Sequence, residues 1–182
     1  MANGPLSGVR ILEAEGIGPG PFASMMMADM GADVIVAHRP RFGPAPGLSE
    51  HPVTDRGKRS IVLDLKDAAD RAVFLKIASH ADGLIEGFRP GVMERLGLGP
   101  EDCHAVNERL VYGRMTGWGQ DGPLAHQAGH DLNYISLSGA VWSSALQGER
   151  PTAPPTLVGD IGGGALYLVA GMLAGFLAAS RT

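Results

Sequence analysis

The chain opens with Val9-Arg10-Ile11-Leu12-Glu13, the glycine-rich turn Gly16-Ile17-Gly18-Pro19-Gly20 and an apolar stretch over residues 21–30. The first run is apolar and partly β-branched, which predicts a strand that leads directly into the turn. Pro21 suits the first turn of a helix, and Gly31 is expected to end that helix. The stretch therefore predicts a strand, a tight turn and a helix in succession.

The same alternation continues along the chain. Short apolar runs predict further strands at residues 33–37, 60–64, 83–86 and 110–115. Amphipathic stretches predict helices at residues 67–79 and 100–107, and residues 40–57 are expected to form a loop. The first of these two helices is expected to bury Ala68, Ala72, Leu75 and Ala78. Strands that alternate with helices indicate an α/β fold, a Rossmann-like βαβ parallel sheet flanked by helices.

The composition is that of a globular protein and excludes some partners. Of the 182 residues, 45% are hydrophobic and 19% charged, which is enough for a packed core. The net charge of −4 provides no basic surface for nucleic acid. Cys103 is the single cysteine, which fits a reducing, cytoplasmic compartment. We interpret it as a thiol without a chemical role, and we expect no metal site, because nothing nearby supplies a second ligand.

Residues 161–179 form an uncharged run that is long enough to cross a membrane. Glycines within the run and Asp160 at its entrance favour a helix buried in a core or a subunit interface instead. Residues 1–8 lack the basic and apolar regions of a secretory signal. We therefore expect no insertion into a membrane.

The turn after the first strand invites comparison with a dinucleotide-binding loop. Its glycines run G-x-G-x-G, not G-x-G-x-x-G, and the second strand ends in His38-Arg39 where such proteins carry a carboxylate. Arg39 suits a phosphate group, which a guanidinium binds through two hydrogen bonds. Taken alone, this residue fits a solvated surface arginine equally well.

Several motifs in a fixed order extend over nearly the whole chain. They are Gly18-Pro19-Gly20-Pro21-Phe22, Ala28-Asp29-Met30-Gly31-Ala32-Asp33-Val34, Arg56-Gly57-Lys58-Arg59-Ser60, Leu63-Asp64-Leu65-Lys66, Glu86-Gly87-Phe88-Arg89-Pro90-Gly91, Arg95-Leu96-Gly97 and Gly117-Trp118-Gly119-Gln120-Asp121-Gly122-Pro123. In this order they resemble the family III CoA-transferases (the CaiB/BaiF family), and within that family the α-methylacyl-CoA racemases.

The resemblance has consequences for the domain organisation. It implies that residues 1–182 are the N-terminal part of a large CoA-binding domain, and that the family's second domain and its C-terminal return are absent. Members of the family form interlocked dimers with the active sites at the subunit interface. We therefore expect a homodimer or a complementary C-terminal polypeptide as partner, with an acyl-CoA as substrate.

The resemblance also implies the residues that contact CoA, and no cofactor beyond the CoA part of the substrate. These residues are Arg39, Leu63, Lys66, Phe88, Arg95, Gly129 and Tyr134. Basic and apolar side chains suit the phosphates and the adenine of CoA. The chain has His38 where the family usually has an acidic residue. For Lys58, Arg59 and Lys66, an ordinary solvated charge is an equally good interpretation.

The motif Ala128-Gly129-His130-Asp131-Leu132-Asn133-Tyr134 is followed, thirty positions after His130, by Asp160. This pattern resembles the racemase branch and implies that His130 and Asp160 are its two catalytic bases. In the transferase branch, a carboxylate at the position of Asp131 attacks the thioester. The expected function is racemisation of 2-methylacyl-CoA thioesters in lipid metabolism. The alternatives are CoA transfer through Asp131 and a non-catalytic fragment.

Racemisation explains why residues of these types are needed. A proton must leave one face of Cα and another must return to the opposite face, so two acid/base groups must flank the carbon. Histidine titrates near neutrality, and a partly desolvated carboxylate can match it. The enolate oxygen needs hydrogen-bond donors, which backbone N–H groups after Gly129 would provide. Without the resemblance, His130 would suit a surface or capping role, and Asp131 and Asp160 would suit helix N-caps.

Overall fold

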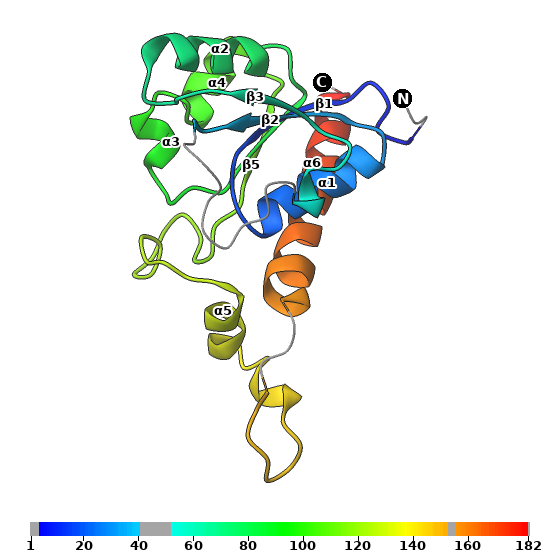
Figure 1. Ribbon diagram of the computed structural model, residues 1–182, viewed down its shortest axis with the longest axis vertical. Helices are drawn as coiled ribbons and strands as arrows, with labels where there is room; N and C mark the ends of the chain where they lie inside the picture. The colour runs from blue at the N-terminus through cyan, green and yellow to red at the C-terminus, as the bar shows by residue number, and fades with distance from the viewer. Residues whose placement is uncertain (1–3, 41–51, 153–155, 182) are drawn as a thin grey trace.

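A computed structural model describes residues 4–40, 52–152 and 156–181. Its centre is a five-stranded sheet in the order β3-β2-β1-β4-β5 (Figure 1). The strands are β1 Arg10–Ala14, β2 Asp33–His38, β3 Arg59–Val62, β4 Gly83–Glu86 and β5 Val111–Arg114. Every neighbouring pair is parallel; Leu12 of β1, for example, aligns with Ile35 on one side and Leu84 on the other. The predicted parallel α/β sheet is confirmed, with strand ends displaced by one or two residues.

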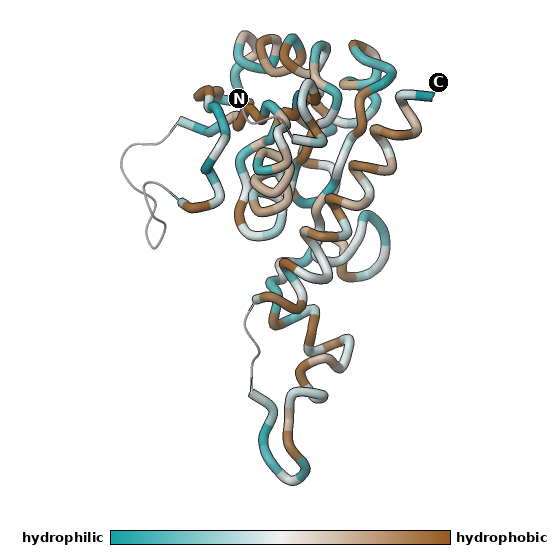
Figure 2. The backbone as a smooth tube through the Cα atoms, turned by 90° about the vertical axis from the view of Figure 1, so that its right-hand side faces the viewer, coloured by the Kyte–Doolittle hydropathy of each residue, from teal (hydrophilic) through white to brown (hydrophobic). Residues whose placement is uncertain are grey.

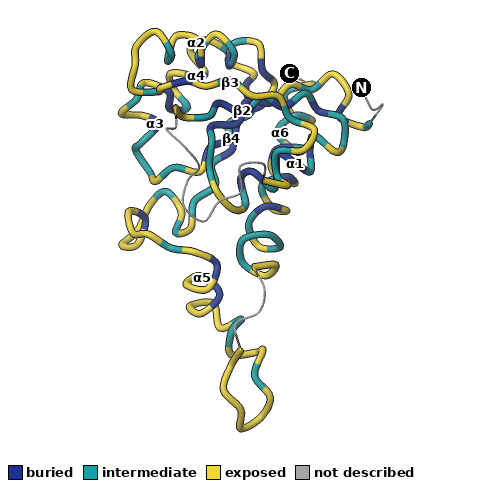
Figure 3. The backbone as a smooth tube through the Cα atoms, in the orientation of Figure 1, coloured by how far each residue is buried: buried dark blue, intermediate teal, exposed yellow. Residues whose placement is uncertain are grey.

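Helices cover both faces of this sheet. They are α1 Pro19–Asp29, α2 Ala68–Ala78, α3 Val92–Arg95, α4 Pro100–Val106, α5 Asp131–Leu137 and α6 Leu166–Ala179. Short 3-10 turns occur at η1 Val53–Asp55 and η2 Trp142–Ser144, and a π-helical segment, η3 Leu157–Ala165, leads into α6. The region from α5 to η2 extends away from the sheet (Figure 1) and is largely exposed (Figure 3).

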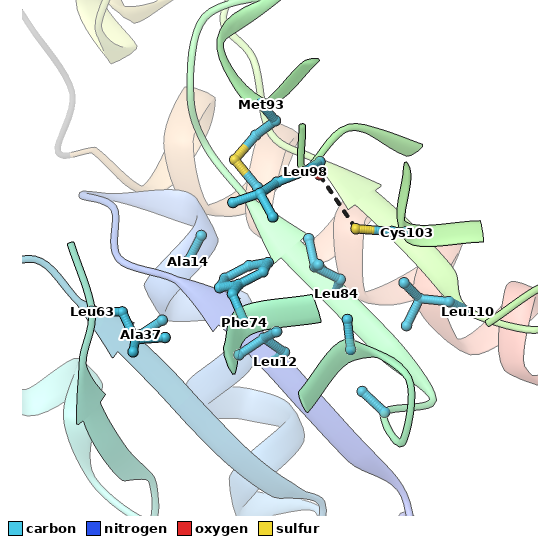
Figure 4. Close-up of a cluster of buried hydrophobic side chains, with 12 residues drawn as sticks. Leu12, Ala14, Ala37, Leu63, Phe74, Leu84, Met93, Leu98, Cys103 and Leu110 are labelled. Carbon is cyan, nitrogen blue, oxygen red and sulfur yellow. Dashed lines mark hydrogen bonds between the residues drawn. The ribbon is translucent and has the colours of Figure 1, made fainter. Parts of the chain in front are cut away.

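Two apolar cores result from the alternation of side chains along the strands. Leu12 packs with Phe74, Leu84 and Leu98 on the face covered by α2, α3 and α4 (Figure 4). The neighbouring Ile11 packs on the other face, against α1 and α6. A strand that is apolar on both faces is typical of a buried parallel sheet.

The buried face of α2 is shifted from the predicted one. Ala78 is buried and Leu75 partly buried against the core, as predicted, whereas Ala68 and Ala72 are exposed and Phe74 is buried instead. The prediction followed the spacing of alanines, but burial of the large Phe74 ring decides which side of α2 faces the sheet, because it removes more apolar surface from water.

Cys103 lies within the core beside α4. Its Sγ donates a hydrogen bond to the carbonyl of Leu98 at 3.3 Å, drawn as a dashed line in Figure 4. Burial, helped by the negative charge of Asp102, raises the pKa of the thiol to about 12. A thiol that stays protonated is a poor nucleophile, which agrees with the interpretation of Cys103 as chemically inert.

The apolar C-terminal run forms one continuous helix over η3 and α6 (Figure 2). It begins at Leu157, earlier than predicted, so Asp160 lies inside the helical segment and not at an N-cap. In the described parts of the chain, one helix, Leu157–Ala179, is long and apolar enough to span a membrane by length and composition. One side of this helix packs on the sheet, where Val169 and Met172 are buried.

Candidate active site

A cavity of about 580 Å³ lies beyond the carboxyl ends of β1, β4 and β5. In the sheet, β2 and β3 lie on one side of β1, and β4 and β5 lie on the other. The connections that follow β1 and β4 therefore run in opposite directions along the sheet and leave a gap between them. Parallel sheets bind their ligands at such a switch point. The described lining is Ile17, Gly18, Pro19, Gly87, Phe88, Arg89, Pro90, Met115, Thr116, Gly117, Trp118, Ala125, Gln127, Ala128, Gly129, His130, Tyr134, Ile135, Ser138, Ala140, Val158, Gly159, Asp160, Gly163 and Gly164.

His130 and Asp160, the two predicted bases, both line this cavity. His130 is the N-cap of α5, and its backbone N–H donates to Asn133 Oδ1 at 2.9 Å. The sequence suggested Asp131 as the capping residue, but Asp131 is the first residue inside the helix. The N-cap residue has extended backbone geometry, so the side chains of His130 and Asp131 leave the chain in different directions.

Asp131 is 4% exposed and, within the described chain, is not part of the cavity lining. Its Oδ2 accepts a hydrogen bond from the backbone N–H of Asp160 at 2.6 Å. A Cβ on Gly159 would lie 2.7 Å from the same Oδ2, so the close approach requires glycine there. Asp131 thus joins α5 to η3 and holds the two candidate bases in one site.

Asp160 has a perturbed carboxyl group. Burial raises its pKa above the usual range, the negative charge of Asp131 raises it further, and His130 opposes the rise. The loop after β1 contributes to this burial, since a Cβ on Gly18 would lie 3.3 Å from Asp160 Oδ2. A carboxyl group with a raised pKa exchanges protons more readily near neutral pH.

An aromatic pair forms another wall of the cavity. The rings of Trp118 and Tyr134 meet edge to face, with centroids 4.8 Å apart and an interplanar angle of 81°. A Cβ on Gly117 would lie 2.1 Å from the Tyr134 hydroxyl, and one on Gly129 would lie 2.6 Å from the same ring. Burial, followed by the charge of Asp160, raises the pKa of Tyr134. Gly117 and Gly129 are both needed, because a side chain at either position would overlap the Tyr134 ring.

Among the residues that the structure describes, no group of three or more His, Cys, Asp or Glu side chains is placed to hold a metal ion.

Comparison with known proteins gives the cavity its family context. A family model described as CoA-transferase family III matches residues 6–182. The chain belongs to CoA-transferase family III. It is similar to the α-methylacyl-CoA racemase of Homo sapiens, at 42% identity over 97% of this chain and 45% of that protein. It is also similar to the acetyl-CoA:oxalate CoA-transferase of Acetobacter aceti, at 37% identity over 98% of this chain and 48% of that protein.

A crystal structure of a CAIB/BAIF family protein from Brucella suis superposes with a TM-score of 0.88 at 29% identity, covering 99% of this chain and 51% of that one. The chain thus spans about half the length of the relatives it matches. Members of family III include a racemase and several CoA-transferases, so membership indicates an enzyme family that acts on CoA thioesters.

The residues predicted to contact CoA fall into two groups in this family III fold. Phe88, Gly129 and Tyr134 line the cavity. The other four, which lie outside its described lining, are Arg39, Leu63, Lys66 and Arg95.

Three of these four follow strands at the same edge of the sheet as the cavity. Arg39 follows β2, is exposed and pairs with Glu15 at 3.4 Å. Leu63 follows β3 and is buried in the core, and Lys66 is exposed shortly after it. Their contact with CoA stays a prediction.

Two further cavity residues were not singled out from the sequence as site residues. Arg89 and Trp118 both line the cavity, and both belong to motifs quoted for the resemblance. Arg89 directly follows Phe88 and places a positive charge at the cavity, where an anionic ligand would be attracted. Motif membership was the available signal for each residue.

Proposed function

We propose that this chain carries the proton-transfer site of an α-methylacyl-CoA racemase. The observation that supports this function is the division of roles at the start of α5. His130 lines the cavity together with Asp160, whereas the carboxylate of Asp131 is buried and bonded to the N–H of Asp160. Racemisation needs two acid/base groups at one cavity, and this arrangement provides them.

In the proposed reaction, His130 and Asp160 act on opposite faces of Cα. One group removes the proton as a base, a thioester enolate forms, and the other group returns a proton to the other face. The raised pKa of Asp160 brings its proton affinity towards that of an imidazole. The backbone N–H groups expected to bind the enolate oxygen are partly engaged at the start of α5: that of His130 donates to Asn133 Oδ1 at 2.9 Å and that of Asn133 to the His130 carbonyl at 2.8 Å.

The CoA part of the substrate is the expected anionic ligand. Arg89 provides a cation at the cavity, and Phe88 and Tyr134 provide apolar and aromatic surface there. These features suit a phosphate-bearing nucleotide with an apolar acyl chain. No cofactor beyond CoA enters the proposed reaction.

CoA transfer is the second candidate function. It is favoured by the similarity to the acetyl-CoA:oxalate CoA-transferase and by the presence of a carboxylate at Asp131. Transfer requires Asp131 to attack the thioester carbonyl, so its side chain would have to leave the N–H of Asp160 and turn towards the cavity.

We also propose that this chain is the N-terminal part of a large CoA-binding domain that works with a second polypeptide or a second copy. The support is an apolar, exposed side of α6, where Tyr167 is 76% and Leu177 52% exposed. Soluble proteins seldom leave such surface uncovered.

The decisive measurement is incorporation of solvent deuterium at Cα of a 2-methylacyl-CoA, with this chain alone and together with the C-terminal half of a family III relative. His130→Ala and Asp160→Ala are each expected to lower exchange by orders of magnitude while CoA affinity changes little. His126→Ala is the matched control, because His126 is an exposed histidine outside the described cavity lining.

Hydroxylamine distinguishes the two enzymatic functions. A hydroxamate formed when hydroxylamine cleaves an anhydride between the acyl group and Asp131, together with CoA transfer to a carboxylate acceptor, would establish the transferase and overturn the racemase. Exchange at Cα without trapping supports the racemase. The absence of both activities, even with the complementary half present, would make the chain a non-catalytic fragment.

A further inference from the structure

A buried polar network lies beneath α1, outside the cavity. Lys58 Nζ donates to Glu13 Oε2 at 2.7 Å and to the carbonyl of Pro21 at 3.0 Å. Ser24 Oγ donates to the same Glu13 oxygen at 2.6 Å and lies 3.1 Å from the Pro21 carbonyl. The Lys58 and Glu13 side chains are only 1% and 2% exposed. Lys58 is therefore not the solvated charge that its basic neighbours in the sequence suggest.

Burial makes this network a geometric constraint. The free-energy cost of removing two charges from water offsets most of their mutual attraction, so a buried ion pair adds little net stability. Its hydrogen bonds nevertheless fix the relative positions of the segments that it joins. The partners come from β1, from the first turns of α1 and from the segment before β3. The network thereby ties the start of α1 to the sheet.

A second contact holds the far end of the same helix. The exposed Arg56 pairs with Asp29 at 2.5 Å. The segment that carries Arg56 and Lys58 therefore contacts α1 both near its start and at its C-terminal end. The neighbouring Arg59 takes no part, because it points to solvent and pairs with Asp33.

The start of α1 leads directly into the cavity wall. Pro19 and Pro21 have fixed φ angles, so holding the Pro21 carbonyl also restrains the turn that precedes it. In that turn, Gly18 has a φ of 70° and packs against Asp160, and a Cβ on Gly164 would lie 3.3 Å from Pro19 Cβ. The position of this turn decides how closely the loop after β1 covers the Asp160 carboxyl group.

We propose that Lys58 is a positioning residue of the site: through Glu13, Ser24 and the Pro21 carbonyl, it holds the loop after β1 against Asp160. Its catalytic consequence rests on the proposed function, whereas its effect on Asp160 does not. When Lys58 is removed, the first turn of α1 loosens and water reaches the Asp160 carboxyl group. The burial that raises the pKa of Asp160 is then reduced.

The test uses Glu13→Gln/Lys58→Met, because Lys58→Met alone would leave an unpaired buried carboxylate. Arg59→Met is the matched control, since it removes an adjacent cation that lies outside the network. The measurement is the titration of the Asp160 carboxyl group by ¹³C NMR, with the signal assigned through Asp160→Asn. The double variant is expected to lower the pKa of Asp160 towards that of an ordinary aspartate, and the control to leave it unchanged.

The proposal is overturned if the folded double variant titrates Asp160 as the parent protein does. Should that variant not fold, Ser24→Ala removes a neutral hydroxyl from the same network; a smaller decrease is expected, and an unchanged titration contradicts the role of Lys58. In deuterium exchange at Cα, the pH profile should move to lower pH, with kcat falling more than KM rises. If the parent protein shows no exchange, the proposed function fails, and the NMR titration still decides the role of Lys58.

Discussion

The substitution Glu86→Gln should remove a loss of folding stability that the protein suffers as the pH rises. Glu86 ends β4, is buried, and its Oε2 accepts the backbone N–H of Phe88 at 2.7 Å. Burial raises the pKa of its carboxyl group from 4.5 to about 7, against the opposing effects of the Phe88 N–H and the nearby Arg114. Since one pKa unit corresponds to about 1.4 kcal/mol, ionising this group in the folded protein costs about 3 kcal/mol.

The direction of the effect follows from proton binding. Between pH 4.5 and 7 the folded protein holds the Glu86 proton and the unfolded chain has released it. The contribution of Glu86 to the free energy of unfolding is therefore fully present below pH 4.5 and is lost as the pH rises through about 7. Glutamine does not ionise, and its amide oxygen can still accept the Phe88 N–H.

Urea unfolding of the parent protein and of Glu86→Gln at pH 5 and at pH 8 tests this expectation. The variant should gain roughly 2–3 kcal/mol relative to the parent between these two pH values. Glu94→Gln is the control from the same cluster: its own backbone N–H and Arg114 hold the pKa of Glu94 below 4.5, so Glu94 is ionised in the folded protein at both pH values and its replacement should change the stability by nearly the same amount at each. An equal stability difference between Glu86→Gln and the parent at both pH values would refute the reasoning.

Two further predictions concern the contact between α5 and η3 and the surface of α6. Gly159→Ala places a Cβ 2.7 Å from Asp131 Oδ2 and should cost about 1–3 kcal/mol in urea unfolding. Gly171→Ala is the comparison, because a Cβ added there would meet no described atom within 4 Å outside the helix's own nearby backbone; it should stabilise α6 by up to about 1 kcal/mol. Similar losses of stability at both positions would argue against the Asp131 contact. The exposed apolar side of α6 predicts self-association of the isolated chain, visible as a concentration-dependent mass in light scattering and reduced by Tyr167→Lys/Leu177→Lys. A monomer at micromolar concentration that binds no hydrophobic dye would contradict this.

The order of the five strands and of the helices α1, α2, α4 and α6 followed from the sequence, because local patterns carry it, whereas the short α3 was not predicted. The apolar run that forms β4 was predicted with its bounds, and Gly31, with a φ of 100°, ends α1 as expected. The cavity residues His130 and Asp160 were identified through the resemblance to a known family. The strand and helix predictions succeed where the signal lies within a short, contiguous segment, whereas the catalytic roles of His130 and Asp160 stay predictions.

Tertiary structure alone decided the direction of side chains and the burial of charges. His130 and Asp131 are neighbours in the sequence, yet one lines the cavity and the other turns to the N–H of Asp160, because a helix begins between them. Lys58 looks like Arg59 in a basic segment, but only Lys58 meets a buried carboxylate on β1. Such outcomes depend on which distant segment supplies the partner. A local pattern of residues carries no information about that partner until the sheet has brought the segments together.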